Sequence, residues 1–391
     1  MIFDDIPRTD ARPCRQSERR SDFLNRSASV YFAEVRRVMD EWFSHLPASD
    51  QDDLRGRLRG EDREADAAFW ELYLHEAYLR SGFEIQIHPE MPGRPTHPDF
   101  RMTKDGEVWY LEAVSVGLHP ELVAEDRRMR AVYQVLEDMR IEDFSLEVTH
   151  YAIGKAPLAT KKMRAALKEW LAGLHPDAVT CGYEDSNALG FDRLPALEWK
   201  DGDWYLEFHA LPMGEWARGV PRSALGVQGP GEAVVVDNVS GLKRVLAAKR
   251  SKYGELDGPL VIAILSSTMY PTRNYEVDQA LYGLSAWRPY DALQHLESYF
   301  EDGFWLTKQG WIRSNIPQVI TAYDLKPWSM TRTQPQLWST LESDVHGPKQ
   351  PDWLARVEVG PESLPRPASP LATHFGLPAE WCLGDPDFSE R

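Results

Sequence analysis

The order in which hydrophobic periodicities follow one another constrains the fold more than any other feature of the sequence. Residues 64–80 repeat apolar side chains at helical spacing and stop at Ser81-Gly82, a good C-terminal cap. Three short strands follow: FEIQIHPE, HPDFRMT and EVWYLEAVSV. The last two are predicted to form a hairpin at Lys104-Asp105-Gly106, because Asp-Gly favours the left-handed backbone of such turns. A second helix over 240–253 and a buried strand, PLVIAILSS, come much later.

This order predicts a mixed α/β (α+β) protein, with an αβββαβ core interrupted by a large insertion. The length of 391 residues leaves room for two or three units. We expect an N-terminal arm and helix over 1–63, with residues 1–26 loosely ordered, and a core over 64–267 whose insertion covers about 117–238. A C-terminal region over 268–391 is rich in Trp and Pro and ends in a Pro-rich tail.

Composition narrows the functional classes. The sequence contains no run of about 18 apolar residues, the pattern that predicts a transmembrane helix. The polar N-terminus has no signal-peptide core. We therefore expect a cytoplasmic protein without membrane contact. The dispersed cysteines argue against a disulfide framework or a zinc site; they are Cys14, Cys181 and Cys382. The net charge of −17 weighs against nucleic-acid binding, although a local basic surface and bound cations can offset it.

One acid interrupts the apolar stripe of the helix over 64–80. A carboxylate buried in such a stripe is costly unless it is paired or bound to a metal. We therefore include Glu76 as a candidate metal ligand; pairing with an Arg, or exposure of the helix end, is the alternative. Glu71 and His75 lie on the flank of the stripe and are expected to be peripheral. The stripe consists of Ala65, Ala68, Phe69, Leu72 and Leu79.

Two further acids lie on the predicted hairpin. Asp99 follows Pro98 in a short strand, and Glu112 interrupts a strand whose other residues are apolar or small. Neighbouring strands lie about 5 Å apart, so the two carboxylates can converge on one cation. Hard oxygen ligands suit Mg²⁺, which needs only one or two carboxylates. Each acid taken alone also has an ordinary structural interpretation.

Together, Glu76, Pro98-Asp99 and Glu112-Ala113-Val114 resemble the PD-(D/E)XK phosphodiesterase superfamily, over about residues 64–116 and 239–267. The resemblance implies a restriction-endonuclease-like fold and a site in which Asp99, Glu112 and Glu76 hold Mg²⁺ or Mn²⁺. It also implies hydrolysis of DNA, with a role in defence against foreign DNA. The stretch from FWELYLHEAYLRSGFEI through AKRSKYGELDGPLVIAI looks like a group of uncharacterised bacterial proteins, a likeness that supplies no activity.

The chain departs from the superfamily pattern at one position. Val114 stands where the superfamily has the lysine that positions or activates the attacking water. Lys249 lies at the centre of the apolar stripe of the helix over 240–253 and is the expected substitute, because it would point at the sheet. Lys252 and Lys104 are second choices. The alternative for Lys249 is that its stem covers apolar surface while its amine reaches water.

Other candidates have weaker signals. The basic side of an inserted helix could contact a DNA backbone or be an ordinary solvated face; its residues are Lys161, Lys162, Arg164 and Lys168. Four aromatic residues could stack on bases or belong to the core: Trp305, Trp311, Trp328 and Trp338. His97, two residues before Asp99, could join the site or lie there incidentally.

Three hypotheses follow. The first is a metal-dependent nuclease in which Asp99 and Glu112 hold Mg²⁺, Glu76 binds or orients a metal-bound water, and Lys249 stabilises developing charge. The second is a catalytically inactive protein of the same fold that binds nucleic acid; Val114 and the acidic composition favour it. The third is a regulatory partner in a larger complex, with the Trp/Pro-rich C-terminal region as the docking surface. A protein partner or a homo-oligomer is left open.

Overall fold

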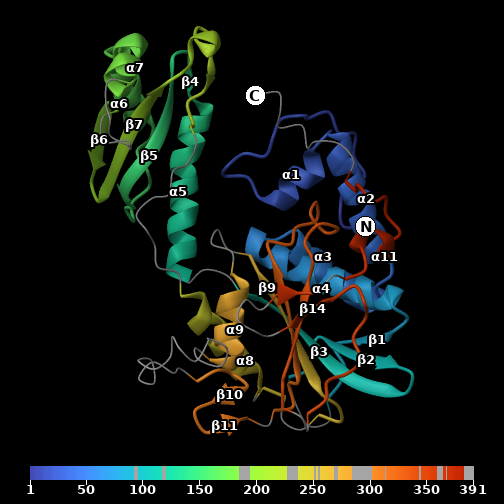
Figure 1. Cartoon of the computed structure of the whole chain (residues 1–391). Coiled ribbons are helices and arrows are strands. Elements are labelled where there is room, and N and C mark those ends of the chain that lie inside the picture. The colour runs from blue at the N-terminus through green and yellow to red at the C-terminus, as the bar shows by residue number, and fades with distance from the viewer. Residues whose placement is uncertain are drawn as a thin grey trace. The chain divides into compact units, whose positions relative to one another are not determined.

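The computed structural model describes two compact units (Figure 1). Unit 1 comprises residues 1–13, 19–117 and 236–389; unit 2 comprises residues 14–18, 118–235 and 390–391. Unit 2 thus contains nearly all of the residues that we treated as an insertion. The described residues are 1–91, 96–116, 120–184, 194–226, 237–250, 252–253, 256–267, 272–283, 302–312, 314–342, 345–358, 364–366 and 368–382, with backbone only at 120–123 and 182–184.

Unit 1 begins with four helices: α1 (Arg20–Arg26), α2 (Val30–Ser44), α3 (Ala48–Leu58) and α4 (Asp62–Arg80). The prediction of a loosely ordered arm over 1–26 is wrong. Ile2, Phe3, Phe23 and Leu24 are buried, so apolar side chains dock the first residues onto the helices. The charged segment before α4 forms α3, because Leu54 and Leu58 give it a buried side.

The main sheet of unit 1 is mixed and contains eight strands in the order β1-β2-β3-β9-β12-β13-β14-β15. Strands β2 (Phe100–Lys104) and β3 (Glu107–Val116) form the predicted hairpin, and β1 (Glu84–Ile87) pairs antiparallel with β2. Asp105 and Gly106 have the positive φ values of 52° and 82° expected of their turn. Strand β9 (Leu260–Ser266) is parallel to β3 and to β12 (Gln318–Tyr323).

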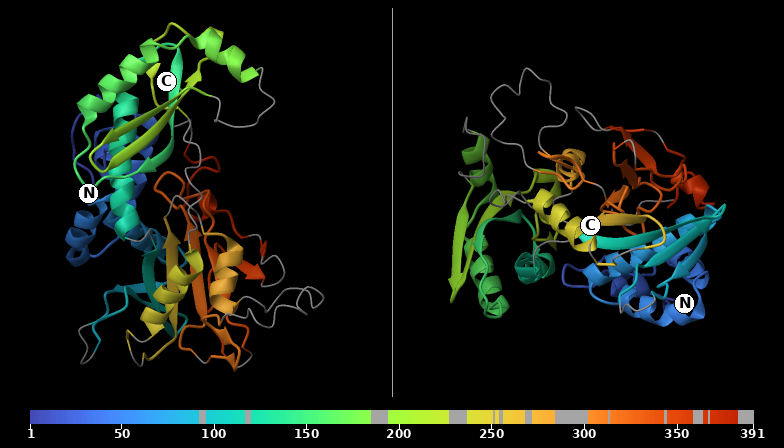
Figure 2. Two further views of the ribbon diagram at one scale, coloured as in Figure 1. Left: turned by 90° about the vertical axis from the view of Figure 1, so that its left-hand side faces the viewer. Right: turned by 90° about the horizontal axis from the view of Figure 1, so that it is seen from below.

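Helices cover both faces of this sheet (Figure 2). On one face α4 packs through Tyr78, whose ring lies 5.4 Å from that of Trp109 on β3. On the other face Tyr110, the next residue of β3, shares a core with α8 (Asn238–Arg250) and α9 (Asn274–Tyr282). Successive residues of a strand point to opposite faces, so even-numbered residues of β3 face α8.

The Trp/Pro-rich C-terminal region contributes to the same sheet. Strands β13 (Gln336–Ser339), β14 (Ala355–Glu358) and β15 (Leu364–Pro365) come from the Pro-rich tail, and α11 (Leu371–His374) follows them. The aromatic hairpin forms as β10 (Leu306–Thr307) and β11 (Gly310–Trp311). Trp305, Trp338 and Trp353 are almost fully buried, so the region is part of the core of unit 1.

Unit 2 contains a three-stranded antiparallel sheet in the order β5-β7-β6. The strands are β5 (Phe144–Ala152), β6 (Ala196–Asp201) and β7 (Trp204–Pro212), and the hairpin turns at Gly202, where φ is +60°. One sheet face packs against α5 (Pro120–Asp138) and α6 (Thr160–Ala172). Helix α7 (Pro176–Glu184), η2 (Glu215–Ala217) and the pair β4 (Arg140–Ile141) and β8 (Arg222–Ser223) complete the unit. None of the described helices is long and apolar enough to cross a membrane.

Candidate functional site

Asp99 and Glu112 lie opposite each other on the β2–β3 hairpin. The register pairs Phe100 with Leu111, so Asp99 comes opposite Glu112 one residue before β2 begins. The backbone N–H of Ala113 donates to Oδ2 of Asp99 at 2.7 Å, which fixes the aspartate against β3. Glu112 is 2% exposed and points to the sheet face that α8 covers. Two carboxylates from adjacent strands therefore meet beneath α8.

A cation from α8 completes this cluster. Lys249 Nζ donates a hydrogen bond to Oε1 of Glu112, and Lys252 Nζ lies 3.3 Å from the same oxygen. Val114, two residues after Glu112, packs against the apolar core on the same face. A lysine side chain at Val114 would enter that core, whereas Lys249 reaches the carboxylate from above it.

The carboxylates and Lys249 influence each other's protonation. Burial raises the pKa of Asp99 well above its usual range, and the charges of Glu112 and Glu71 raise it further. Burial opposes the charge of Lys249, but its hydrogen bond to Glu112 and the charge of that residue outweigh this effect and raise the pKa of the lysine. Perturbed acids of this kind, held beside a specific cation, are typical of functional sites.

Tyr253 contacts the other oxygen of Glu112, a role that nothing in the sequence pattern indicates. Its hydroxyl donates to Oε2 of Glu112 at 2.5 Å. Burial and this hydrogen bond both raise the pKa of Tyr253, so the phenol keeps its proton. The ring of Tyr253 lies in the apolar core, and only the structure shows where its hydroxyl points.

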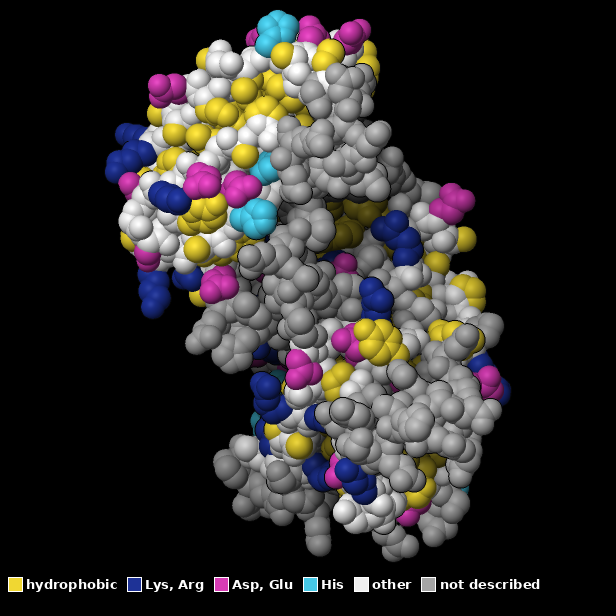
Figure 3. Space-filling view, turned by 60° about the vertical axis from the view of Figure 1, so that its left-hand side comes forward, with side chains coloured by type: hydrophobic (Ala, Val, Ile, Leu, Met, Phe, Trp, Pro, Cys, Tyr) yellow, Lys and Arg dark blue, Asp and Glu magenta, His cyan; other side chains and the backbone are white. Residues whose placement is uncertain are grey.

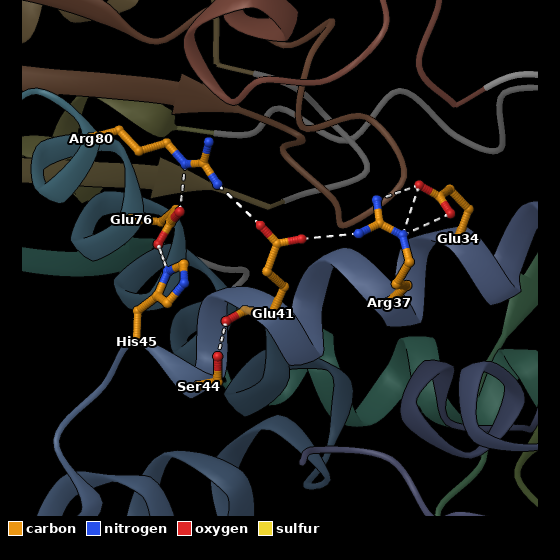
Figure 4. A network of polar contacts seen from close by, with 7 residues as sticks. All are labelled: Glu34, Arg37, Glu41, Ser44, His45, Glu76 and Arg80. Atoms are coloured by element: carbon orange, nitrogen blue, oxygen red, sulfur yellow. Dashed lines mark hydrogen bonds and ion pairs between the residues drawn. The ribbon is translucent and has the colours of Figure 1, made fainter.

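Glu76 does not join the cluster, which corrects our prediction of a three-acid site. Its side chain is fully buried, but its oxygens contact His45 Nδ1 at 2.7 Å and Arg80 Nε at 2.5 Å. Figure 4 shows this network continuing through Glu41 to Arg37. The physical reason is that α4 covers the sheet face opposite to Glu112. Pairing with an arginine, the alternative that we left open, is the observed state.

Glu71 is the glutamate of α4 whose charge acts on Asp99. Its side chain is 15% exposed, and Arg57 binds both of its oxygens, each at 2.6 Å. We had expected Glu71 to be peripheral, because it lies on the flank of the helical stripe. Glu71 nevertheless lies close enough to Asp99 for its charge to act on that carboxyl. His75, its neighbour on α4, is 4% exposed and lies against the ring of Phe100.

The remaining unit 1 candidates lie outside the cluster. Lys104 Nζ donates to the carbonyl of Ser81 at 2.6 Å. His97 is exposed, and its ring lies 4.9 Å from that of His88. Trp305 and Trp338 are buried, whereas Trp328 is half-buried with its ring 6.2 Å from Phe32, and Trp311 is 36% exposed. Stacking on bases is therefore open only to the last two of these tryptophans.

The basic side of α6 is largely solvent-facing. Lys161, Lys162 and Lys168 are exposed and Arg164 is half-buried. Lys162 pairs with Asp201 at 2.8 Å, with 73% of its own side chain exposed. On the face drawn in Figure 3, Lys and Arg side chains are interspersed with acidic ones. The three lysines are therefore accessible to a polyanion in the folded protein.

Asp99 and Glu112 present carboxylate oxygens, which are the ligands that hard divalent cations prefer. Among the described residues, no group of three or more His, Cys, Asp or Glu side chains could hold a metal ion. Two carboxylates meet the modest requirement of Mg²⁺, which retains several waters in its shell.

Comparisons with family models, curated proteins and solved structures found no match to this chain. The structure shows a mixed α/β fold with one large mixed sheet and additional small sheets.

Proposed function

We propose that the chain is a metal-dependent nuclease that hydrolyses DNA phosphodiester bonds on a restriction-endonuclease-like core of the PD-(D/E)XK type. The contact between Lys249 and Glu112 is the observation that carries this proposal. This contact brings a lysine of α8 to the carboxylate beside Asp99. The proposal requires such a lysine, because Val114 stands where the superfamily has its own. The element order from α4 to β9 agrees with the same core.

Each residue of the site has a defined part in this proposal. Asp99 and Glu112 would hold Mg²⁺ or Mn²⁺, which when bound supplies a Lewis acid and an acidified water. Lys249 would stabilise the negative charge that develops on the phosphoryl oxygens. Glu71, in place of Glu76, would act on the site through its charge. The basic side of α6 would contact the DNA backbone, and defence against foreign DNA remains the biological context we propose.

A second candidate function is nucleic-acid binding without catalysis. It is favoured by the contacts of Glu112, which already accepts hydrogen bonds from Lys249, Lys252 and Tyr253. An acid with three protein donors is satisfied without any metal. The two candidates differ in one measurable respect, which is metal-dependent cleavage.

The deciding experiment is a cleavage assay with Mg²⁺ or Mn²⁺ on single- and double-stranded DNA and on RNA. Asp99→Ala and Glu112→Ala are expected to lower the rate at least about 100-fold, since each removes a direct metal donor. Glu107→Ala, an exposed acid of the same strand β3, should cleave at the wild-type rate. Equal residual rates in the wild type and Asp99→Ala would refute the proposal.

The glutamates of α4 provide a matched pair of variants. Glu71→Gln should lower the cleavage rate about tenfold, because it removes a charge that acts on Asp99. Glu76→Gln should leave the rate per folded molecule unchanged, yet lower the free energy of unfolding by about 2 kcal/mol through its buried ion pairs. Cleavage and urea unfolding measured on both variants check this assignment; the reverse pattern would restore Glu76 to the site.

A further inference from the structure

We infer that Tyr253 is a positioning residue that determines which oxygen of Glu112 faces the candidate metal site. The inference rests on the proposed function, and it concerns a side chain that the proposed mechanism does not otherwise use. Tyr253 lies just beyond the C-terminal end of α8, next to Lys252.

The two oxygens of Glu112 have different surroundings. Oε2 accepts a hydrogen bond from the Tyr253 hydroxyl at 2.5 Å, and the phenol ring is 1% exposed within the core that includes Leu246 and Ile262. Oε1 faces the ammonium groups of Lys249 and Lys252. A neutral donor packed in the core therefore holds one oxygen, and the ammonium groups of partly exposed lysines hold the other.

Asp99 is arranged in the same way. Its Oδ2 accepts the backbone N–H of Ala113 at 2.7 Å, which leaves Oδ1 as the oxygen that the β3 backbone does not hold. In each carboxylate a neutral donor of the fold thus fixes one oxygen. An ammonium group can move away when a divalent cation competes for Oε1 of Glu112, but the Tyr253 hydroxyl cannot leave without disturbing the core.

This division gives Tyr253 a specific effect on metal affinity. Without its hydroxyl, Glu112 would lose the donor that fixes its torsion, and Oε2 would remain buried without that partner. Groups that orient a metal ligand typically change metal affinity by about 10- to 100-fold. Tyr253→Phe removes only the oxygen atom and retains the ring in the core.

The chain offers a matched control in Tyr110. Its hydroxyl donates to Oδ1 of Asp257 at the same distance of 2.5 Å, and its ring belongs to the same core cluster. Tyr110→Phe therefore removes an equivalent hydrogen bond between a tyrosine and a carboxylate that does not involve Asp99 or Glu112.

The experiment measures Mn²⁺ binding to the full chain by isothermal titration calorimetry, with Mn²⁺ as the only added ligand. It compares the wild type, Tyr253→Phe, Tyr110→Phe and Asp99→Ala. Thermal melts establish that each variant is folded. Tyr253→Phe should bind Mn²⁺ at least about tenfold more weakly, and Tyr110→Phe should bind within about twofold of the wild type. Excess Mn²⁺ should restore much of the cleavage rate of Tyr253→Phe, as expected of a residue that acts through Glu112.

Two results would overturn the inference, and they are distinguishable. Equal Mn²⁺ affinity in Tyr253→Phe and the wild type, with Asp99→Ala weakened, would remove the role of Tyr253 and leave the proposed function intact. Equal Mn²⁺ binding in the wild type and Asp99→Ala would remove both. Equal weakening in Tyr253→Phe and Tyr110→Phe would mean a general effect on the core, and would also overturn the inference.

Discussion

At the scale of single residues, the ammonium of Lys249 occupies an oxygen that a divalent cation would need. Glu112 is buried, so its charge depends on a close partner. The lysine meets this requirement when no metal is bound and becomes a competitor when one arrives. Lys249 is therefore expected to lower metal affinity while it assists cleavage.

Lys249→Met separates these two effects. Cleavage should fall at least about 100-fold because the cation next to the reacting phosphate is lost. Affinity for Mn²⁺ should rise, because Oε1 of Glu112 loses its main competitor. Arg244→Met, which removes an exposed cation from the same helix, should change neither quantity. Weaker Mn²⁺ binding in Lys249→Met would show that the lysine does not compete with the metal.

At the scale of elements, hydrophobic periodicity was enough to predict α4, the β2–β3 hairpin, α8 and β9. It also located Glu112 and Lys249, since each interrupts an apolar pattern on an element that packs against the other. Periodicity cannot show which sheet face a helix covers. That is why Glu76 was assigned to the site, although α4 covers the sheet face opposite to Glu112.

Strands β13 and β14 were missed for a different reason. Prolines surround them, each has only four residues, and the side chains of β13 do not alternate as in an isolated half-buried strand. Their pairing depends on neighbouring strands of the sheet, such as β12 for β13. Pairing of this kind overrides local propensity, so the sequence indicated only a Pro-rich tail.

Helix α4 contains a buried histidine, His75, that makes the stability of the fold depend on pH. Burial lowers the pKa of His75 from 6.5 to about 4, although the charge of Glu76 opposes the shift. Between these values the unfolded chain binds a proton that the folded chain excludes. The contribution of His75 is thus fully present above pH 6.5 and is lost as the pH falls toward 4.

His75→Phe tests this sign. Between pH 7 and pH 4.5 the wild type should lose about 2–3 kcal/mol more unfolding free energy than His75→Phe. His97→Phe, which replaces an exposed histidine, should follow the wild type. Urea unfolding at the two pH values measures the difference, and parallel losses in the wild type and His75→Phe would contradict the assignment.

At the scale of the whole molecule, the C-terminal region is part of the main core. Trp353 is 2% exposed; its ring contacts those of Tyr73 and Tyr78 on α4, and its Nε1–H donates to Ser81 Oγ at 3.1 Å. The end of the chain thereby holds the helix that carries Glu71 against the sheet.

Trp353→Ala should therefore lower the free energy of unfolding of unit 1 by about 3–5 kcal/mol, the usual effect of emptying a large aromatic site. Trp216→Ala, at a side chain 86% exposed, should change it by less than about 0.5 kcal/mol. Urea unfolding followed by circular dichroism makes the comparison. A small effect at Trp353 would mean that the tail is dispensable for the core.

The acidic composition makes DNA binding by the whole chain depend on local surfaces. Replacing Lys161, Lys162 and Lys168 of α6 with Ala should weaken DNA binding about tenfold or more at low salt. It should also reduce the slope of log affinity against log salt by about 3 on duplex DNA, if each lysine neutralises one phosphate. Fluorescence anisotropy at several salt concentrations measures both. An unchanged slope would assign these lysines to an ordinary solvated face.

Most of unit 2 lies between β3 and β9 in the sequence, and this order affects when the parts of the site are synthesised. Glu112 leaves the ribosome before residues 118–235 of unit 2. Lys249, Tyr253 and β9, the parallel neighbour of β3, emerge after them. At roughly 5–20 residues per second, this delay is on the order of ten seconds. During that time the nascent protein carries both carboxylates without the lysine and the phenol, so a polypeptide released early would hold an incomplete centre. A nuclease built in this order would acquire its activity only once its synthesis had passed α8.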